Sequence, residues 1–236
     1  MFNAQLSSVM TPILDGGLQP SGIQRLMPRA IVHGSHQVQG MQLFHPVHTQ
    51  TIQHVQAIQR HATRNTITGT LLRANLESHV LELGSAHSFW SLDYSKWKAI
   101  STQTWISHTW QHMRQAGLTL RGPIPSLPAR READVHLTDF FFALDTYTAD
   151  QLDTLQACRM HLRITTLADG CTADGLRIAN NTWNGHRLDR STSYKWRRSY
   201  RPGGSSWELW CGALKHLLPP FATHRCLIER NHLDFG

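Results

Sequence analysis

A chain of 236 residues is long enough for one large domain or two small ones, and its core needs no covalent cross-links. The composition is 40% hydrophobic and 17% charged with a mean hydropathy of −0.35, which excludes a disordered or a membrane-embedded chain. The net charge of +7 favours an anionic partner, nucleic acid first and an acidic membrane surface second. A basic protein without a polyanionic partner is the alternative.

The cysteine pattern predicts a reducing compartment. Four cysteines lie far apart without a Cys-x-x-Cys pair, so neither a disulfide framework nor a zinc ribbon is indicated. No signal peptide pattern is evident at residues 1–17, and no run approaches the roughly 20 apolar residues of a membrane helix. We therefore expect an intracellular protein, cytoplasmic or nuclear, with no membrane partner.

The hydrophobic periodicity predicts a mainly α fold of irregular helical domains, with a possible small β-hairpin near the N-terminus. Residues 29–33 and 41–44 are short apolar runs, typical of a hairpin or of ordered loops. A helix from Thr49 carries apolar residues on one side, and a second helix runs from about Thr70 to Gly84. The second buries a stripe, and after it come aromatic residues expected at the core edge. Stripe and aromatic residues are Leu72, Leu76, His79, Leu83, Phe89, Trp90, Tyr94 and Trp97.

A third helix is expected to run from Thr102 to Gly117. The proline-rich segment 122–128 then predicts a domain boundary, which gives an N-terminal helical region, 1–121, and a C-terminal one, 122–236. In the latter we expect a helix over 131–144 and a second that Thr148 opens with a capping box. Ser205 or Ser206 caps the last helix, which Pro219 ends.

The segment 187–201, which we call the basic aromatic strip, is the densest cluster of charge in the chain. Its basic residues oppose one acid, Asp189, and aromatic residues alternate with them. Cations neutralise phosphates and rings stack on bases, so the strip predicts a site for RNA or DNA. The predicted binding residues are Arg187, Arg190, Tyr194, Lys195, Trp196, Arg197, Arg198, Tyr200 and Arg201. The alternative is a solvated basic loop whose Trp196 packs on the core.

Enzymatic alternatives rest on weaker patterns, and we predict no catalytic residue, metal or cofactor. Four aspartates could assemble a two-metal nuclease site, but their neighbours indicate exposed helix positions and turns; they are Asp134, Asp139, Asp169 and Asp174. Cys171 between them lacks a paired base and is expected to be a small buried or loop residue. His108 and His112 have the spacing of a zinc helix, but Thr109 stands where its general base belongs.

A strand-transfer enzyme is a second enzymatic alternative. The order His61, Arg64, Trp90, Tyr94 is similar to that of tyrosine recombinases, in which the tyrosine attacks a phosphodiester. Those enzymes also need an arginine far upstream, and this chain begins too close to supply it.

Several short motifs span most of residues 20–215. They are residues 22–34, 40–43, 68–73, 131–135, 158–162, 167–175 and 207–210, with Gln50, His54 and the short helix around Trp105 to Trp110. Together they resemble the region that lies downstream of the polymerase palm in reverse-transcriptase open reading frames of eukaryotic retroelements.

The resemblance implies a thumb-like or connecting region that grips a primer-template while catalysis occurs elsewhere. The Tyr-x-Asp-Asp turn that holds the polymerase metal ions does not occur in the sequence, so the chain cannot polymerise by itself. A polymerase palm domain on another chain is the implied protein partner. The chain would be an accessory piece, or a structural remnant of a decayed element without independent activity.

Overall fold

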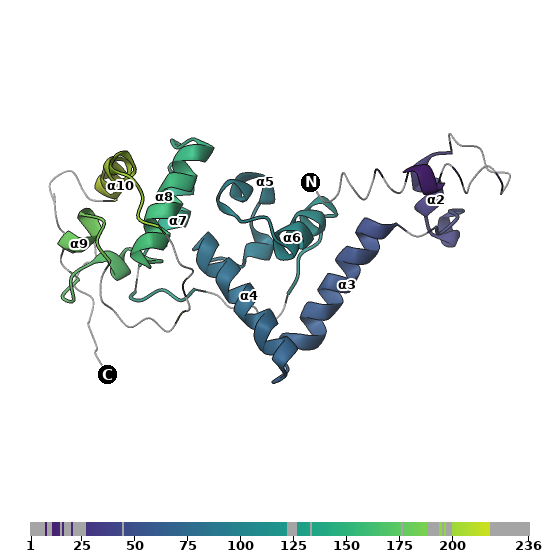
Figure 1. The fold of residues 1–236 in the computed structure, drawn as a ribbon, viewed down its shortest axis with the longest axis horizontal. Helices are drawn as coiled ribbons and strands as arrows, with labels where there is room; N and C mark the ends of the chain where they lie inside the picture. The colour runs from purple at the N-terminus through teal and green to yellow at the C-terminus, as the bar shows by residue number, and fades with distance from the viewer. Residues whose placement is uncertain are drawn as a thin grey trace. The chain divides into compact units, whose positions relative to one another are not determined.

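A computed structural model of the chain describes residues 8, 11–14, 16, 20, 27–43, 45–121, 127–132, 134–175, 177–187, 194, 196 and 200–217. The chain divides into two compact units, Met1–Arg60 and His61–Gly236, and each is described by itself. The described residues are mainly helical, as Figure 1 shows, and they contain no β-sheet. The predicted fold class is confirmed.

The first unit contains α2 (Arg29–His33), the 3-10 turn η1 (His36–Val38) and α3 (Pro46–His61), whose last residue belongs to the second unit. The possible hairpin does not form among the described residues, because Arg29–His33 is a helical turn. The chain nevertheless returns beside it: Met41 N–H donates to Ile31 O at 2.8 Å, and Leu43 N–H to Val32 O at 2.9 Å. Backbone pairing therefore exists there without two strands.

The second unit begins with α4 (Ile67–Leu83), whose ends follow from its sequence. Thr66 Oγ1 accepts the N–H of Gly69 at 3.1 Å, and Gly84 takes the left-handed conformation with φ +66°. The expected stripe of Leu72, Leu76, His79 and Leu83 is buried. This prediction is confirmed, although the helix begins three residues before Thr70.

Aromatic side chains fill the core between α4 and α6 (Trp105–Gln115). They come from η2 (Phe89–Ser91), α5 (Tyr94–Trp97) and η3 (Lys98–Ile100), which follow in the chain. Trp110 is fully buried, and its ring centroid lies 5.8 Å from Phe89 and 5.0 Å from Tyr94. The aromatic segment is therefore part of the core rather than its edge, where the sequence placed it.

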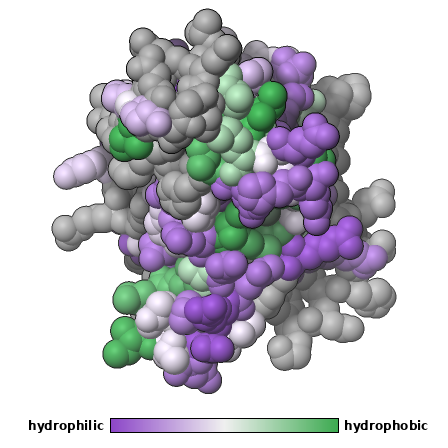
Figure 2. Space-filling view, turned by 90° about the vertical axis from the view of Figure 1, so that its right-hand side faces the viewer, coloured by the Kyte–Doolittle hydropathy of each residue, from purple (hydrophilic) through white to green (hydrophobic). Residues whose placement is uncertain are grey.

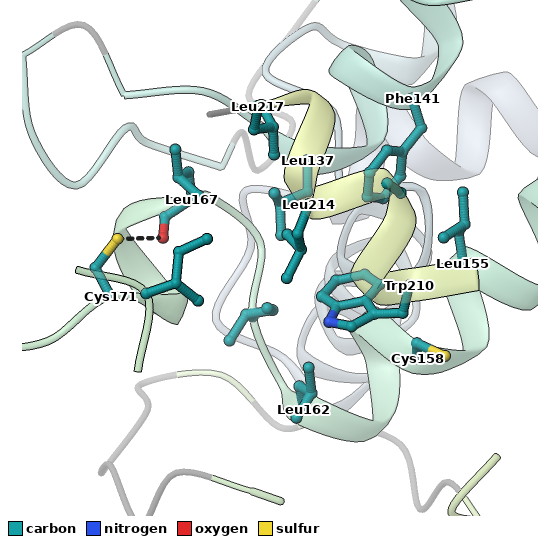
Figure 3. Packing of buried hydrophobic residues seen from close by; sticks show 13 residues of the cluster. Leu137, Phe141, Leu155, Cys158, Leu162, Leu167, Cys171, Trp210, Leu214 and Leu217 are labelled. Atoms are coloured by element: carbon teal, nitrogen blue, oxygen red, sulfur yellow. Dashed lines mark hydrogen bonds between the residues drawn. The ribbon is translucent and has the colours of Figure 1, made fainter. Parts of the chain in front are cut away.

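The remainder of the second unit packs around α7 (Leu137–Ala143), α8 (Ala149–Leu162) and α10 (Gly204–His216), with η4 (Ala168–Gly170) and α9 (Asn180–Trp183) beside them. Figure 3 shows the side chains of the shared core, among them Trp210 of α10 and Phe141, whose ring centroids lie 5.9 Å apart. The indole N–H of Trp210 donates to Thr182 O at 3.1 Å. The capping box at Thr148 is confirmed. The expected cap at Ser205 or Ser206 is wrong: Gly203 precedes α10 without a side-chain cap.

A buried arginine of α8 joins α8 to the end of α4. Arg159 is 0% exposed, and its guanidinium donates to Leu81 O at 2.6 Å, Glu82 O at 2.7 Å and Ile164 O at 3.0 Å. Burial lowers the pKa of Arg159 to about 9, against the charges of Glu82, Asp169 and Asp139. The guanidinium therefore stays charged at pH 7. Its positive charge offsets the partial negative charge of the carbonyl groups at the C-terminal end of α4.

Contacts also join residues on the two sides of the predicted boundary at 122–128. Asp139 accepts the N–H of Ala86 at 2.8 Å, and Trp97 stacks on Phe142 with centroids 4.1 Å apart. Both pairs lie within the second unit. Residues 122–126 of the boundary lie outside the described residues, so the division into 1–121 and 122–236 stays a prediction.

The coloured surface of Figure 2 is mixed, with hydrophilic residues predominating and hydrophobic ones in small separate patches. Exposed apolar side chains include Ile52, Ile67 and Leu71. Among the described residues, no helix combines the length and the apolar character needed to cross a membrane.

Candidate nucleic-acid interface

The structure describes the two ends of the basic aromatic strip and two residues between them. Arg187, Tyr194, Trp196, Tyr200 and Arg201 are placed. The other four predicted binding residues lie outside the described residues; they are Arg190, Lys195, Arg197 and Arg198.

The first end of the strip is fixed on α8 and α10. After α9, Gly185 takes φ +66°, and a Cβ there would lie 2.4 Å from Cε2 of Trp207. The backbone thus passes directly over the Trp207 ring, as only glycine allows at this φ. Two residues on, Arg187 Nε donates to His161 O at 2.9 Å, at the end of α8.

The second end of the strip returns to the same place. Arg201 Nη2 donates to Asn184 O at 3.0 Å, so residues 17 apart in sequence are joined. Trp207 Nε1 donates to Pro202 O at 3.1 Å just before α10 begins. We call these contacts the neck of the strip: they hold Asn184 and Arg201 together and fix where the intervening segment leaves the core.

His161 lies under the neck, and sequence reasoning did not single it out. Its side chain is 8% exposed and packs edge-on against Trp207 with centroids 5.9 Å apart. Burial lowers the pKa of His161, and the positive charges of Arg187 and Arg201 lower it further, against hydrogen bonds to the backbone at Tyr200 and Gly185. A neutral His161 lets two cations sit beside it, which a charged imidazole would oppose.

The aromatic residues of the strip differ in how far they are available for stacking. Tyr200 is 97% exposed. Trp196 is partly buried, and its buried Nε1 has no hydrogen-bond partner among the residues that the structure describes. Tyr194 is also partly buried, and the guanidinium of Arg130 lies 6.0 Å from its ring centroid, a cation–π distance. Of these three, Tyr200 offers an open ring face, and the exposed Arg201 follows it.

Three of the four aspartates of the nuclease alternative accept hydrogen bonds from backbone N–H groups, and the fourth accepts one from a hydroxyl. Asp169 Oδ2 accepts the N–H of Thr165 at 2.8 Å, and Oδ1 pairs with Arg130 Nε at 3.1 Å. Asp134 accepts the N–H groups of Arg130 and Ala168, Asp139 that of Ala86, and Asp174 the hydroxyl of Thr172. In the described part of the chain, no three His, Cys, Asp or Glu side chains are grouped to hold a metal ion.

Three other candidate catalytic residues, Trp90, Tyr94 and Cys171, lie in the core. Trp90 and Tyr94 are buried among aromatic rings, and Tyr94 Oη donates to Gln103 Oε1 at 3.3 Å. Cys171 is buried, as expected, but it is disulfide-bonded, which the cysteine pattern did not indicate, so it offers no thiol. Its sulfur lies 3.2 Å from Leu167 O (Figure 3). Burial raises the pKa of Cys158 to about 12, so this thiol is not a nucleophile at neutral pH.

Comparisons with known proteins give no relative from which a function could be transferred. No family model matches the chain, no curated protein matches it, and no solved structure matches it. The function is therefore argued from the residues alone.

Proposed function

We propose that the chain is a non-catalytic nucleic-acid-binding region related to retroelement reverse transcriptases. The observation that carries the proposal is the pairing of an open tyrosine ring with an adjacent exposed arginine, Tyr200 and Arg201, on a backbone fixed at the neck. One donor of Arg201 holds the neck at Asn184, and the exposed guanidinium has further N–H donors that could bind a phosphate.

The proposed mechanism is electrostatic capture followed by stacking, with little readout of sequence. The arginines neutralise phosphates, which concentrates a strand at the strip, and Tyr200 then stacks on a base. Arg197 and Arg198 supply further charge by their place in the sequence. A polymerase palm domain on another chain is the proposed protein partner, since the sequence lacks a polymerase motif of its own.

Fluorescence anisotropy with a labelled single-stranded homopolymer tests the proposal. Affinity should fall steeply with salt, and replacing Arg197 and Arg198 by Ala should weaken binding to all sequences alike and reduce the salt slope by about 1.4, at about 0.7 per phosphate. Lys96→Ala with Lys98→Ala is the charge-matched control, because both lysines are exposed outside the strip. Equal weakening by the two double variants would refute the assignment of the strip.

Stacking is tested by a second pair of variants. Tyr200→Ala removes the ring and should cost about 1–3 kcal/mol of binding free energy, whereas Tyr200→Phe keeps the ring and should bind like the original chain. Equal affinities of all three proteins would show that Tyr200 does not stack.

A metal-dependent nuclease or strand-transfer enzyme is the rival function. The hydrogen bonds of Asp169 to the backbone favour a structural role, because ligands of a catalytic metal need free carboxylate oxygens. Incubation of labelled duplex with Mg²⁺ decides between the two. Cleavage that disappears in Asp174→Asn, a variant at an exposed turn, would establish the nuclease and remove the proposal of a non-catalytic role.

A further inference from the structure

The first unit contrasts with the rest of the chain in its charges. Asp15 is the one acidic residue in the sequence before Glu77. Residues 27–43 and 45–60, which the structure describes, contain two arginines and five histidines and no carboxylate side chain. These are Arg29, His33, His36, His45, His48, His54 and Arg60.

Three of these histidines, which are separated in the sequence, lie together in the structure. The ring of His45 lies edge-on to His33 with centroids 4.7 Å apart, and it stacks on His48 with centroids 4.0 Å apart and planes at 21°. We call His33, His45 and His48 the histidine cluster. It lies where α2 ends and α3 begins.

Two hydrogen bonds fix the rings and the position of the next proton. His33 Nδ1 lies 3.0 Å from Leu43 O. Because a carbonyl oxygen only accepts, Nδ1 carries the hydrogen and donates it, so Nε2 is the nitrogen of His33 that can take up a further proton. His45 Nδ1 accepts the N–H of His48 at 3.4 Å in the first turn of α3. Protonation of His45 at Nδ1 would therefore cost that bond.

Charging stacked imidazoles is unfavourable unless an anion lies nearby. Two unit charges 4 Å apart repel by about 1 kcal/mol even in water, and by more beside the protein. The titratable and charged groups of the described part of this unit are the two arginines and five histidines named above, and among themselves they repel when charged. Burial lowers the pKa of His54, which therefore takes up its proton after an unshifted histidine would. A bound polyanion would offset this repulsion.

We propose that the histidine cluster and the exposed side of α3 form a second contact surface for nucleic acid, engaged when the cluster becomes charged. The proposal rests on the proposed function. His48 and Arg60 are exposed on α3, with Gln53, Gln56 and Gln59 exposed between them, so phosphate and sugar oxygens would meet cations and amide donors along one helix. Because proton uptake and strand binding assist each other, affinity must rise as the pH falls.

Anisotropy titrations of the full chain at pH 7.5 and 5.5 test the surface. The original chain should bind a single-stranded homopolymer about fivefold or more tightly at pH 5.5, the lower range of such couplings. His45→Asn with His48→Gln should lose this gain, because Asn keeps an acceptor for the helix N–H but does not titrate. His87→Gln with His216→Gln, two exposed histidines of the second unit, is the matched control and should keep the gain.

Further variants separate this proposal from that of the strip. Arg197→Ala with Arg198→Ala should bind weakly at pH 7.5 and recover part of its affinity at pH 5.5, whereas Arg60→Gln should weaken binding at pH 5.5 and leave it nearly unchanged at pH 7.5. If the double variant His45→Asn with His48→Gln binds at pH 7.5 and gains as much affinity at pH 5.5 as the original chain, the second surface is refuted and the strip proposal stands. No binding by the original chain at either pH would overturn both. Circular dichroism at both pH values checks that each variant is folded.

Discussion

The guanidinium of Arg159 donates to the carbonyl oxygen of Leu81 over 2.6 Å, although 78 residues separate them in sequence. This bond joins α8 to the last turn of α4, where carbonyls have no partner within their helix. A fully buried arginine is costly to desolvate, so its contribution depends on filling its donors with acceptors. The stability of α4 and that of α8 therefore depend on each other.

Arg159→Met should destabilise the protein by at least about 3 kcal/mol. The thioether fills space but donates nothing, so the carbonyls of Leu81, Glu82 and Ile164 lose their donor in the core, at about 1–3 kcal/mol for each buried acceptor left unpaired. Urea unfolding measures the difference. Arg163→Met, exposed at the end of the same helix, is the control and should change stability by less than about 0.5 kcal/mol. Equal effects would mean that the buried bonds contribute nothing net.

Gly84→Ala should destabilise the protein more than Gly117→Ala does. Both glycines have φ near +70°, so both substitutions add about 1–2 kcal/mol of backbone strain. A Cβ at residue 84 would also lie 2.5 Å from Cζ of Arg159, whereas a Cβ at residue 117 meets open space. The additional steric strain in Gly84→Ala, about 1–3 kcal/mol, should lower its midpoint of urea unfolding below that of Gly117→Ala. Matching midpoints would show that Arg159 moves aside freely.

Local signals made the helices predictable from sequence, and long-range contacts made the candidate site unpredictable. The capping box at Thr148 and the C-terminal Gly84 act within one turn, so α8 and the end of α4 could be placed. Residues 29–33 have β-branched side chains that suggest a strand, yet no partner strand exists among the described residues, and a helical turn forms. Tertiary context decides such short segments.

The neck of the strip illustrates the same limit at the site. The charges and rings of 187–201 are visible in the sequence, but nothing local indicates that Arg187 binds His161 O or that Arg201 binds Asn184 O. Arg159 was likewise hidden, because charged residues rarely enter a core. Its position four residues after Leu155 on the buried side of α8 was the available signal.

Thr148→Ala should destabilise the protein by about 1 kcal/mol. The hydroxyl of Thr148 accepts the N–H of Gln151 at 3.3 Å, and the Gln151 side chain accepts the N–H of Thr148 at 2.9 Å, so the substitution leaves one N–H at the start of α8 without an acceptor. Thermal unfolding gives the difference. Thr146→Ala removes the same atoms from an exposed position in the preceding loop and should be neutral. If the two variants unfold alike, solvent replaces the cap.

His161→Gln should reduce the amount by which the free energy of unfolding falls between pH 7.5 and pH 5. Burial and the charges of Arg187 and Arg201 lower the pKa of His161 in the folded chain, so the unfolded chain binds more protons below pH 6.5. The stability that a neutral His161 contributes is thus complete above pH 6.5 and is lost as pH falls toward the folded pKa. Unfolding free energies between pH 7.5 and 5 measure this, with the exposed His186→Gln as control. Parallel curves for the original chain and His161→Gln would contradict the lowered pKa.

Gly185→Ala should weaken nucleic-acid binding, although Gly185 is not among the residues proposed to contact the strand. A Cβ at residue 185 would lie 2.4 Å from the Trp207 ring at a φ of +66°, so the ring must move, and with it the bond from Trp207 Nε1 to Pro202 O. The strip then leaves the core from a less fixed neck, and ordering it on a strand costs more conformational entropy. Anisotropy should show weaker binding than in Gly117→Ala, which has the same backbone strain in open space. Unchanged affinity in a destabilised Gly185→Ala protein would mean that the neck supports the fold but does not prepare the strip for binding.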